Sequence, residues 1–230
     1  VFDRFHRDLV AVFWWMIATS AIAAACGTKS YKELAAIPRQ CKEWVAPLPR
    51  FERGAAYFMM GVVLLKFVEG VILPPSTQDA LAYHIPRLFH WFSHGSLAFY
   101  ETFYPVQNYI VPGYSLILAN IDAICREDFF YPMVQWTSFV TLGITSSLIA
   151  QSFGGGRRCQ VLSALIVWLM PIAIAQSTST YCDLLAAATL VAFVHFYLKV
   201  LSSACRPGDM VWCGVLGGLA VLSKTQNLLF

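Results

Sequence analysis

The stretch Val71-Ile-Leu-Pro-Pro-Ser-Thr-Gln-Asp-Ala-Leu-Ala-Tyr-His-Ile-Pro-Arg87 decides the fold, because a long apolar segment gives way there to a polar one. The apolar segment, Gly54–Leu73, is long enough to cross a hydrocarbon core of about 30 Å. Two prolines end it, and Asp79 follows where lipid headgroups would meet water. A carboxylate at that level suits an enzyme that acts on a lipid-linked substrate.

The composition indicates an integral membrane protein. Its 230 residues are 58% hydrophobic and 13% charged, whereas soluble domains contain about 25% charged residues. We expect one all-α polytopic module over residues 1–230, a fragment of a longer protein because it opens at Val1 and closes within an apolar run. No basic run is interleaved with aromatic residues, which argues against a nucleic-acid partner. The seven scattered cysteines contain no Cys-x-x-Cys pair, which argues against a disulfide framework or a zinc ribbon.

Six apolar segments are predicted to cross the membrane: Val10–Cys26, Gly54–Leu73, Phe129–Phe153, Cys159–Gln176, Leu184–Ala204 and Met210–Phe230. Short loops rich in Lys and Arg stay cytoplasmic, so the loops before Gly54 and at Gly154–Arg158 are expected inside. The acidic segment 74–128 and the loop Ser177–Asp183 are then outside, and Asp79 and Asp183 share one face.

Segment 74–128 is too long for a simple turn and must have structure of its own. Gly113–Cys125 spans only about 20 Å as a helix and is predicted to lie along the membrane surface. Asp79–His94 is predicted to be an amphipathic surface helix kinked by Pro86, with Asp79, Tyr83, Arg87, His90 and His94 on a solvated polar face. His90 and His94 have a zinc-ligand spacing, but no third ligand is evident and no metal site is predicted.

Three charged residues are candidates for chemistry, each with a structural alternative. Asp79 could be a helix N-cap, a general base, or both. Asp183 could cap a helix or orient a substrate together with the hydroxyl-rich loop before it. Lys224 is expected 14 residues into the last segment, where it would either snorkel to the surface or bind the phosphate of a lipid carrier. Gly214-x-x-x-Gly218 is predicted to be a helix-packing motif.

Four blocks occur in the order found in a known family. They are Gln78-Asp-Ala-Leu-Ala-Tyr-His-Ile-Pro-Arg-Leu-Phe-His-Trp-Phe-Ser-His-Gly-Ser-Leu97, Tyr104-Pro-Val-Gln-Asn-Tyr-Ile-Val-Pro-Gly-Tyr-Ser-Leu116, Gln176-Ser-Thr-Ser-Thr-Tyr-Cys-Asp183 and Gly217-Gly-Leu-Ala-Val-Leu-Ser-Lys-Thr225. Together they resemble bacterial GT-C-type membrane glycosyltransferases, a group that includes protein O-mannosyltransferases, aminoarabinose transferases and lipopolysaccharide-core galacturonosyltransferases. Two departures are Gln78 before Asp79, where several relatives have adjacent acids, and Val111-Pro112, where many have Pro-Pro.

The resemblance implies a GT-C-like helix bundle in the bacterial inner membrane, with an active site open to the periplasm. It implies an inverting transfer of a sugar from a polyprenyl-phosphate donor to a glycan, lipid or protein acceptor. Asp79 would be the catalytic base and Asp183 a second acid of the site. The implied substrate-binding residues are Tyr83, His84, Arg87, Gln107, Asn108 and Lys224, with Arg87 and Lys224 facing the donor phosphate. No cofactor is required, and dependence on a divalent metal stays open.

Two other functions remain open at this point. A transporter or flippase for a lipid-linked sugar would use the same acidic mouth to admit a headgroup. A non-catalytic membrane subunit would tolerate the loss of both acids. Release of free polyprenyl phosphate distinguishes a transferase from either alternative.

Overall fold

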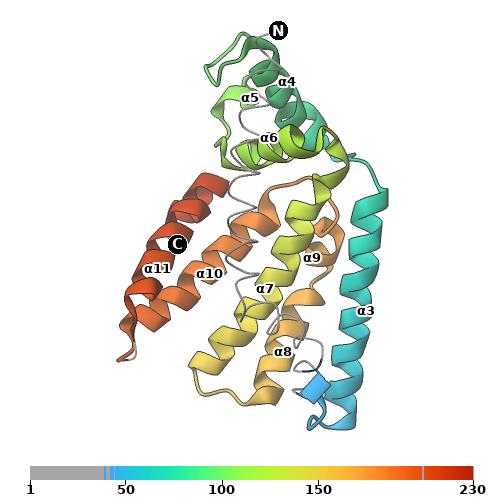
Figure 1. Cartoon of the computed structure of the whole chain (residues 1–230), viewed down its shortest axis with the longest axis vertical. Coiled ribbons are helices and arrows are strands. Elements are labelled where there is room, and N and C mark those ends of the chain that lie inside the picture. The colour runs from blue at the N-terminus through green and yellow to red at the C-terminus, as the bar shows by residue number, and fades with distance from the viewer. Residues whose placement is uncertain (1–38, 40–41, 44, 204, 230) are drawn as a thin grey trace, which may run out of the picture.

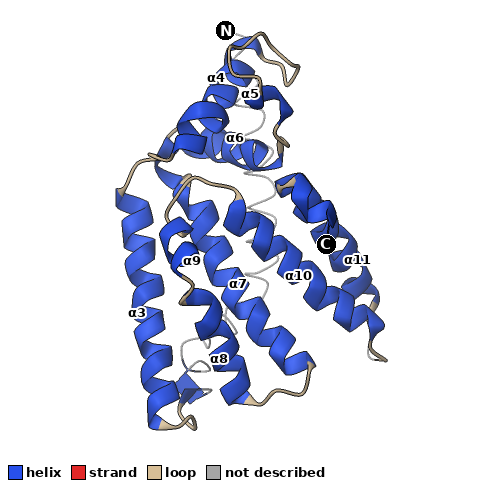
Figure 2. Ribbon diagram, turned by 180° about the vertical axis from the view of Figure 1, so that it is seen from behind, coloured by secondary structure: helices blue, strands red, loops and turns tan. Residues whose placement is uncertain are grey.

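The computed structural model describes residues 39, 42–43, 45–203 and 205–229, and Figure 1 shows their arrangement. All regular secondary structure within these ranges is helical (Figure 2), which confirms the predicted all-α class. The first predicted crossing, Val10–Cys26, lies outside the described residues. Element labels follow Figure 1.

In the described part of the chain, three helices are long and apolar enough to cross a membrane. They are α3 (Arg50–Ile72), α7 (Pro132–Ser152, preceded by the 3-10 turn Asp128–Phe130) and α10 (Asp183–Leu201). They match the predicted segments that begin at Gly54, Phe129 and Leu184. The side chains of Phe58, Leu64 and Leu65 on α3 are more than half exposed, as expected of a helix whose outer face meets lipid.

The predicted crossing Cys159–Gln176 is wrong as a single helix. The chain forms α8 (Arg157–Trp168) and then α9 (Pro171–Gln176), and Met170 between them is extended. Proline has no backbone N–H and disfavours the α conformation of the residue before it, so Pro171 ends the first helix and begins the second.

The last helix, α11 (Pro207–Ser223), is 17 residues long and ends earlier than predicted. It packs along α10 in both views (Figures 1 and 2). Gly217 makes this contact, since a Cβ there would lie 3.2 Å from the Phe193 ring. The packing role predicted for Gly214 and Gly218 is wrong for the described residues, because a Cβ at either position would have no atom within 4 Å.

Apolar side chains and two indole groups join the helices of the bundle. Its core contains Val63, Phe139, Leu142, Ala173, Leu184 and Ala188. Trp136 donates to the Val63 carbonyl at 2.9 Å and Trp168 to the Phe139 carbonyl at 2.8 Å. The Trp168 ring occupies the place that a side chain at Gly143 would fill.

Ion pairs hold the end of the bundle where α3 begins. Arg158 lies 2.6 Å from the buried Glu52 and links α8 to α3. Lys199 lies 3.1 Å from Asp209 and links α10 to α11. At the other end, the last turns of α3 and α11 and the first turns of α7 and α10 meet a separate group of short helices (Figure 1).

We call this group, residues 76–127, the cap. It contains the π-helical turn Ala80–His84 and the helices α4 (Ile85–His94), α5 (Val106–Tyr109) and α6 (Gly113–Cys125). Helix α6 lies across the end of the bundle, and α4 and α5 lie beyond it (Figures 1 and 2). That α6 lies along a membrane surface stays a prediction. Leu88, Tyr114 and Leu118 of the cap share a buried cluster with Tyr131 and Val134 of the bundle.

The polar face of the helix around Arg87 is turned inward. The prediction of a solvated face is therefore wrong for Tyr83 and Arg87, which are buried, while Leu81 and Phe89 are more than half exposed. This reversal is stable because the irregular segment 98–110 and α6 offer carbonyl and hydroxyl groups to the inward side chains.

Candidate functional site

Asp79 lies in the cap, at the start of the helix that follows α3. It is partly exposed, and its carboxylate lies close enough to the hydroxyl of Tyr83, one turn later, to influence the pKa of that phenol. Burial and this neighbouring carboxylate raise the pKa of Tyr83 above its usual range, so the phenol stays protonated and donates. No side-chain capping bond from Asp79 is present at this helix start, so the N-cap alternative finds no support.

Asp183 is the first residue of α10, and both of its carboxylate oxygens have partners. Lys224 Nζ lies 2.5 Å from Oδ1, and Gln176 Nε2 donates to Oδ2 at 2.9 Å. The N-cap position belongs to Cys182, and no side-chain cap bond occurs there. The carboxylate is therefore fixed by side chains from two other segments.

Lys224 was expected within the last helix, and this expectation is wrong. α11 ends at Ser223 and Lys224 is extended, which lets its side chain reach Asp183. The sequence left open whether Lys224 snorkels to the surface or binds a phosphate. In the structure it binds an anion, but that anion is the Asp183 carboxylate. The side chains of Lys224 and Asp183 are 37% and 38% exposed, so the pair remains open to the surroundings.

The structure brings Asp79, Asp183 and Lys224 into one electrostatic neighbourhood. Both carboxylates raise the pKa of Tyr83, although burial is the larger cause. Both also act on Lys224, and both raise the pKa of the Cys182 thiol, which burial and these charges bring to about 11. Two acids that are 104 residues apart, as their numbers show, thus lie at the same end of the bundle.

Two residues that the sequence did not single out position Asp183. Gln135 of α7 is fully buried, donates to the Tyr181 carbonyl and accepts from the Leu185 N–H at 3.0 Å. Gln176 donates directly to Asp183. The available signal was a glutamine inside, or at the end of, an otherwise apolar segment, because such an amide needs partners that only the fold supplies.

Glu69 of α3 joins the same region. It accepts hydrogen bonds from Lys66 at 2.8 Å and from Thr178 at 3.1 Å. Lys66 and Glu69 are three residues apart and form an ion pair within their helix. Through the bond to Thr178, the loop that leads to Asp183 is attached to the last turn of α3.

The cap contacts α11 next to Lys224. Gly113 begins α6 so close to Leu222 that a side chain at this position would overlap the Leu222 carbonyl oxygen. Glycine is required there because only a hydrogen in place of Cβ allows the two backbones to approach. This contact fixes the end of α11, and hence Lys224, against the cap.

Arg87 does not face this site. It is 2% exposed, and it donates to the carbonyls of Gln107 at 2.5 Å and Ile110 at 2.8 Å while lying over the Trp91 ring. Carbonyl groups inside the cap occupy its guanidinium in this structure, and its binding of the donor phosphate stays a prediction.

His84 is enclosed within the cap rather than lining an open site. Its Nδ1 lies 2.9 Å from the Ser115 hydroxyl, and its ring contacts Tyr114. Burial, and next the charge of Arg87, lower the pKa of His84 to about 3, so the imidazole is neutral. A substrate could reach it only if the cap opened.

Gln107 and Asn108 hold segment 98–110 together. Gln107 Nε2 donates to the Ala82 carbonyl at 2.8 Å, and its Oε1 accepts from Tyr100 and Thr102. Asn108 Nδ2 donates to the Tyr100 carbonyl at 2.8 Å. The described contacts of Gln107 are internal to the cap, which makes it a positioning residue.

The bond between Gln107 and Ala82 has a cause in the sequence. The Ala82 carbonyl would ordinarily accept from the N–H four residues later, but that residue is Pro86. The helix widens into a π turn here, where the Ile85 N–H bonds the Ala80 carbonyl, and the side-chain amide of Gln107 replaces the missing donor. Next to Pro86 the helix thus forms a π turn, which was not predicted, and the predicted kink stays a prediction.

His90 and His94 stack on each other, with ring centroids 5.7 Å apart, and His90 also stacks on Tyr100. Among the described residues, no group of three or more His, Cys, Asp and Glu is arranged to hold a metal ion. His90 and His94 therefore have no third metal ligand beside them in the described part of the chain.

Searches against protein-family models, curated proteins and solved structures found no match to this chain. Its function must therefore be argued from the residues at the cap end of the bundle.

Proposed function

We propose that this chain is a membrane-embedded glycosyltransferase of the GT-C type. It would transfer a sugar from a polyprenyl-phosphate donor to a hydroxyl or amine acceptor, with inversion at the sugar carbon. One observation carries the proposal: Lys224 is paired with Asp183 where helices of membrane-spanning length end at a polar cap, and Asp79 of the cap is near enough to act electrostatically on Lys224. The resemblance of four sequence blocks to that family supports the same assignment.

The two acids would have different roles. Asp79 is partly exposed beside the Tyr83 hydroxyl, so its carboxylate is accessible to a substrate proton. Asp183 has partners on both oxygens and holds Lys224. We therefore assign the base to Asp79 and a positioning role to Asp183, in place of two interchangeable catalytic acids.

Each bond in the proposed reaction has a group to assist it. Asp79 takes the proton of the acceptor, whose oxygen or nitrogen attacks the sugar carbon from the face opposite the phosphate. The carbon–oxygen bond to phosphate breaks, and polyprenyl phosphate leaves with the bonding electrons. The Lys224 ammonium has three N–H groups, of which one serves Asp183, so two remain for the charge that develops on the phosphate.

Orientation follows from the distribution of charge. Arg50, Arg53, Arg157 and Arg158 lie at the end opposite the cap, and Lys- and Arg-rich short loops stay cytoplasmic. The cap end would then face the periplasm of a bacterium, with the chain in the inner membrane. Single cysteines introduced by Ser76→Cys and Phe153→Cys in a cysteine-free background test this, because both positions are exposed. Labelling of only Ser76→Cys by an impermeant maleimide in intact cells is expected.

The test of the reaction is the Asp79→Asn variant assayed for sugar transfer and for release of free polyprenyl phosphate. Loss of a general base lowers the rate by about 10²–10⁴-fold, while the amide keeps the shape of the side chain. Asp128→Asn, which changes an exposed acid in the 3-10 turn before α7, is the matched control and should retain activity. Full turnover by a folded Asp79→Asn protein would exclude the base. Movement of an intact lipid-linked sugar across the membrane would identify a transporter instead.

A further inference from the structure

A groove with a volume of about 700 Å³ lies in the cap, on segment 99–109. Its lining residues are Phe99, Tyr100, Glu101, Thr102, Phe103, Pro105, Asn108 and Tyr109. None of the three charged residues of the proposed catalytic site is among them. The groove is therefore a separate feature of the cap, with its own chemistry.

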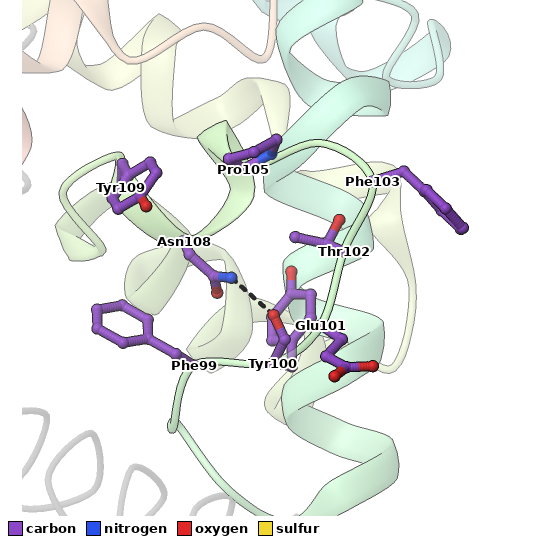
Figure 3. Close-up of a pocket in the computed structure, with 8 residues that line it drawn as sticks. All are labelled: Phe99, Tyr100, Glu101, Thr102, Phe103, Pro105, Asn108 and Tyr109. Atoms are coloured by element: carbon purple, nitrogen blue, oxygen red, sulfur yellow. Dashed lines mark hydrogen bonds between the residues drawn. The ribbon is translucent and has the colours of Figure 1, made fainter.

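Aromatic rings stand exposed on this groove. The side chains of Phe99 and Tyr109 are 81% and 82% exposed. Figure 3 shows these two rings on either side of the Asn108 amide. Exposed aromatic faces beside a polar group are typical of a binding surface, because covering the rings with an apolar face of a ligand removes apolar surface from water and is favourable.

The groove is built from fixed groups. The Asn108 amide donates to the Tyr100 carbonyl at 2.8 Å, which sets its orientation (Figure 3). The Tyr100 ring stacks on His90 at 3.8 Å, and the Tyr100 and Thr102 hydroxyls both donate to Gln107. Such preorganisation lowers the entropy lost when a ligand binds.

The charge of the lining selects the class of ligand. Among the described residues that line it, Glu101 is the only carboxylate, and none is Lys, Arg or His. A phosphate would meet repulsion here, while hydroxyl groups find acceptors in Glu101 and Asn108. A pyranose ring offers both an apolar face and hydroxyl groups, since its C–H face can cover an aromatic ring and its edge carries the hydroxyls.

We propose that this groove binds the carbohydrate part of the acceptor, as a neutral or amine-bearing sugar chain. The assignment of the ligand to the acceptor rests on the proposed transferase function. Gln107 connects the groove to the catalytic end, because it bonds groove residues on one side and the Ala82 carbonyl, next to Tyr83, on the other. An acceptor held in the groove is thereby attached to the helical turn that carries Asp79.

The test is equilibrium binding of radiolabelled cellohexaose and glucosamine hexamer to the full chain in nanodiscs, without any donor. Both probes should bind, and the amine-bearing probe should bind more tightly. Phe99→Ala and Tyr109→Ala should each weaken binding by about five- to tenfold. Glu101→Gln should abolish the preference for the amine-bearing probe. Phe153→Ala, which removes an exposed ring at the opposite end of the bundle, should change nothing.

Two results would overturn the proposal. One is failure of both oligosaccharides to bind, or binding that the groove variants leave unchanged. The other is quenching of a Phe99→Trp protein by brominated acyl chains, since the ring would then sit in lipid. Binding is measured without donor, so it does not depend on sugar transfer. An Asp79→Asn protein that binds the probes but transfers no sugar therefore separates the groove proposal from the transferase proposal. Binding without any transfer activity would count against the transferase alone.

Discussion

Lys224 Nζ lies 2.5 Å from Oδ1 of Asp183, a residue 41 positions earlier in the chain. Hydrogen bonding to that carboxylate raises the pKa of Lys224, so the ammonium is charged. Both side chains are more than a third exposed, and exposed ion pairs contribute only about 0–1 kcal/mol to stability. The pair is better understood as a means of aiming a cation than as a structural brace.

Lys224→Met is therefore expected to lower sugar transfer by about 10²-fold or more with little change in thermal unfolding, because a cation beside the leaving phosphate is lost. Lys224→Arg should retain part of the activity. Measurement of initial rates at saturating acceptor, together with unfolding in detergent, separates the two effects. A melting temperature that falls in proportion to activity would show that the pair mainly supports the fold.

Gln107→Leu should destabilise the cap by about 1 kcal/mol, because it removes the side-chain amide that donates to the Ala82 carbonyl. Adding Pro86→Ala restores an N–H four residues after Ala82 and should recover part of this loss. Limited proteolysis within residues 98–110 provides the measurement. Pro86→Ala alone is the control, and additive losses in the double variant would contradict the idea that Gln107 replaces the missing N–H.

Gly113→Ala should displace α6 from α11, because the added methyl group overlaps the backbone of Leu222. Both stability and transfer should fall, since Lys224 follows this contact by two residues. Gly218→Ala on α11, the other helix of this contact, is the matched control: its methyl group meets no atom within 4 Å, and alanine favours the helix. Equal behaviour of the two variants would argue against a close contact at Gly113.

Acid should loosen the cap through His84. Its pKa is about 3 in the folded protein, below the ordinary value of 6.5, so folding favours the neutral ring. This contribution is complete above pH 6.5 and is lost as the pH falls toward 3, by about 1.4 kcal/mol per pH unit within that window. Hydrogen exchange at Ser115 as a function of pH measures it. His84→Asn should show a shallower dependence, and identical slopes would exclude His84 as the cause.

The apolar runs were enough to predict the helices α3, α7 and α10, because membrane spans are encoded locally by length and composition. Grouping Asp79 with Asp183 also followed from local signals, namely loop charge and the shortness of α6. The interruption between α8 and α9 was signalled by Pro171. The prediction missed it because the segment was judged by its hydropathy alone.

The inward arginine could not be predicted in the same way. The partners of Arg87 are backbone carbonyls at Gln107 and Ile110, in a segment without periodicity, and every residue type has such a carbonyl. The end of α11 was equally hidden, because the extended conformation of Lys224 depends on reaching Asp183 across the fold.

Helix α3 is attached to both acids. A short connection joins its last residue, Ile72, to the helix of Asp79, and Glu69 holds Thr178 in the loop that leads to Asp183. When a helix tilts to match a thicker or thinner bilayer, its ends move together with whatever is attached to them. Both carboxylates would then shift in the same direction, and the distance between them would stay nearly the same in membranes of different lipid composition.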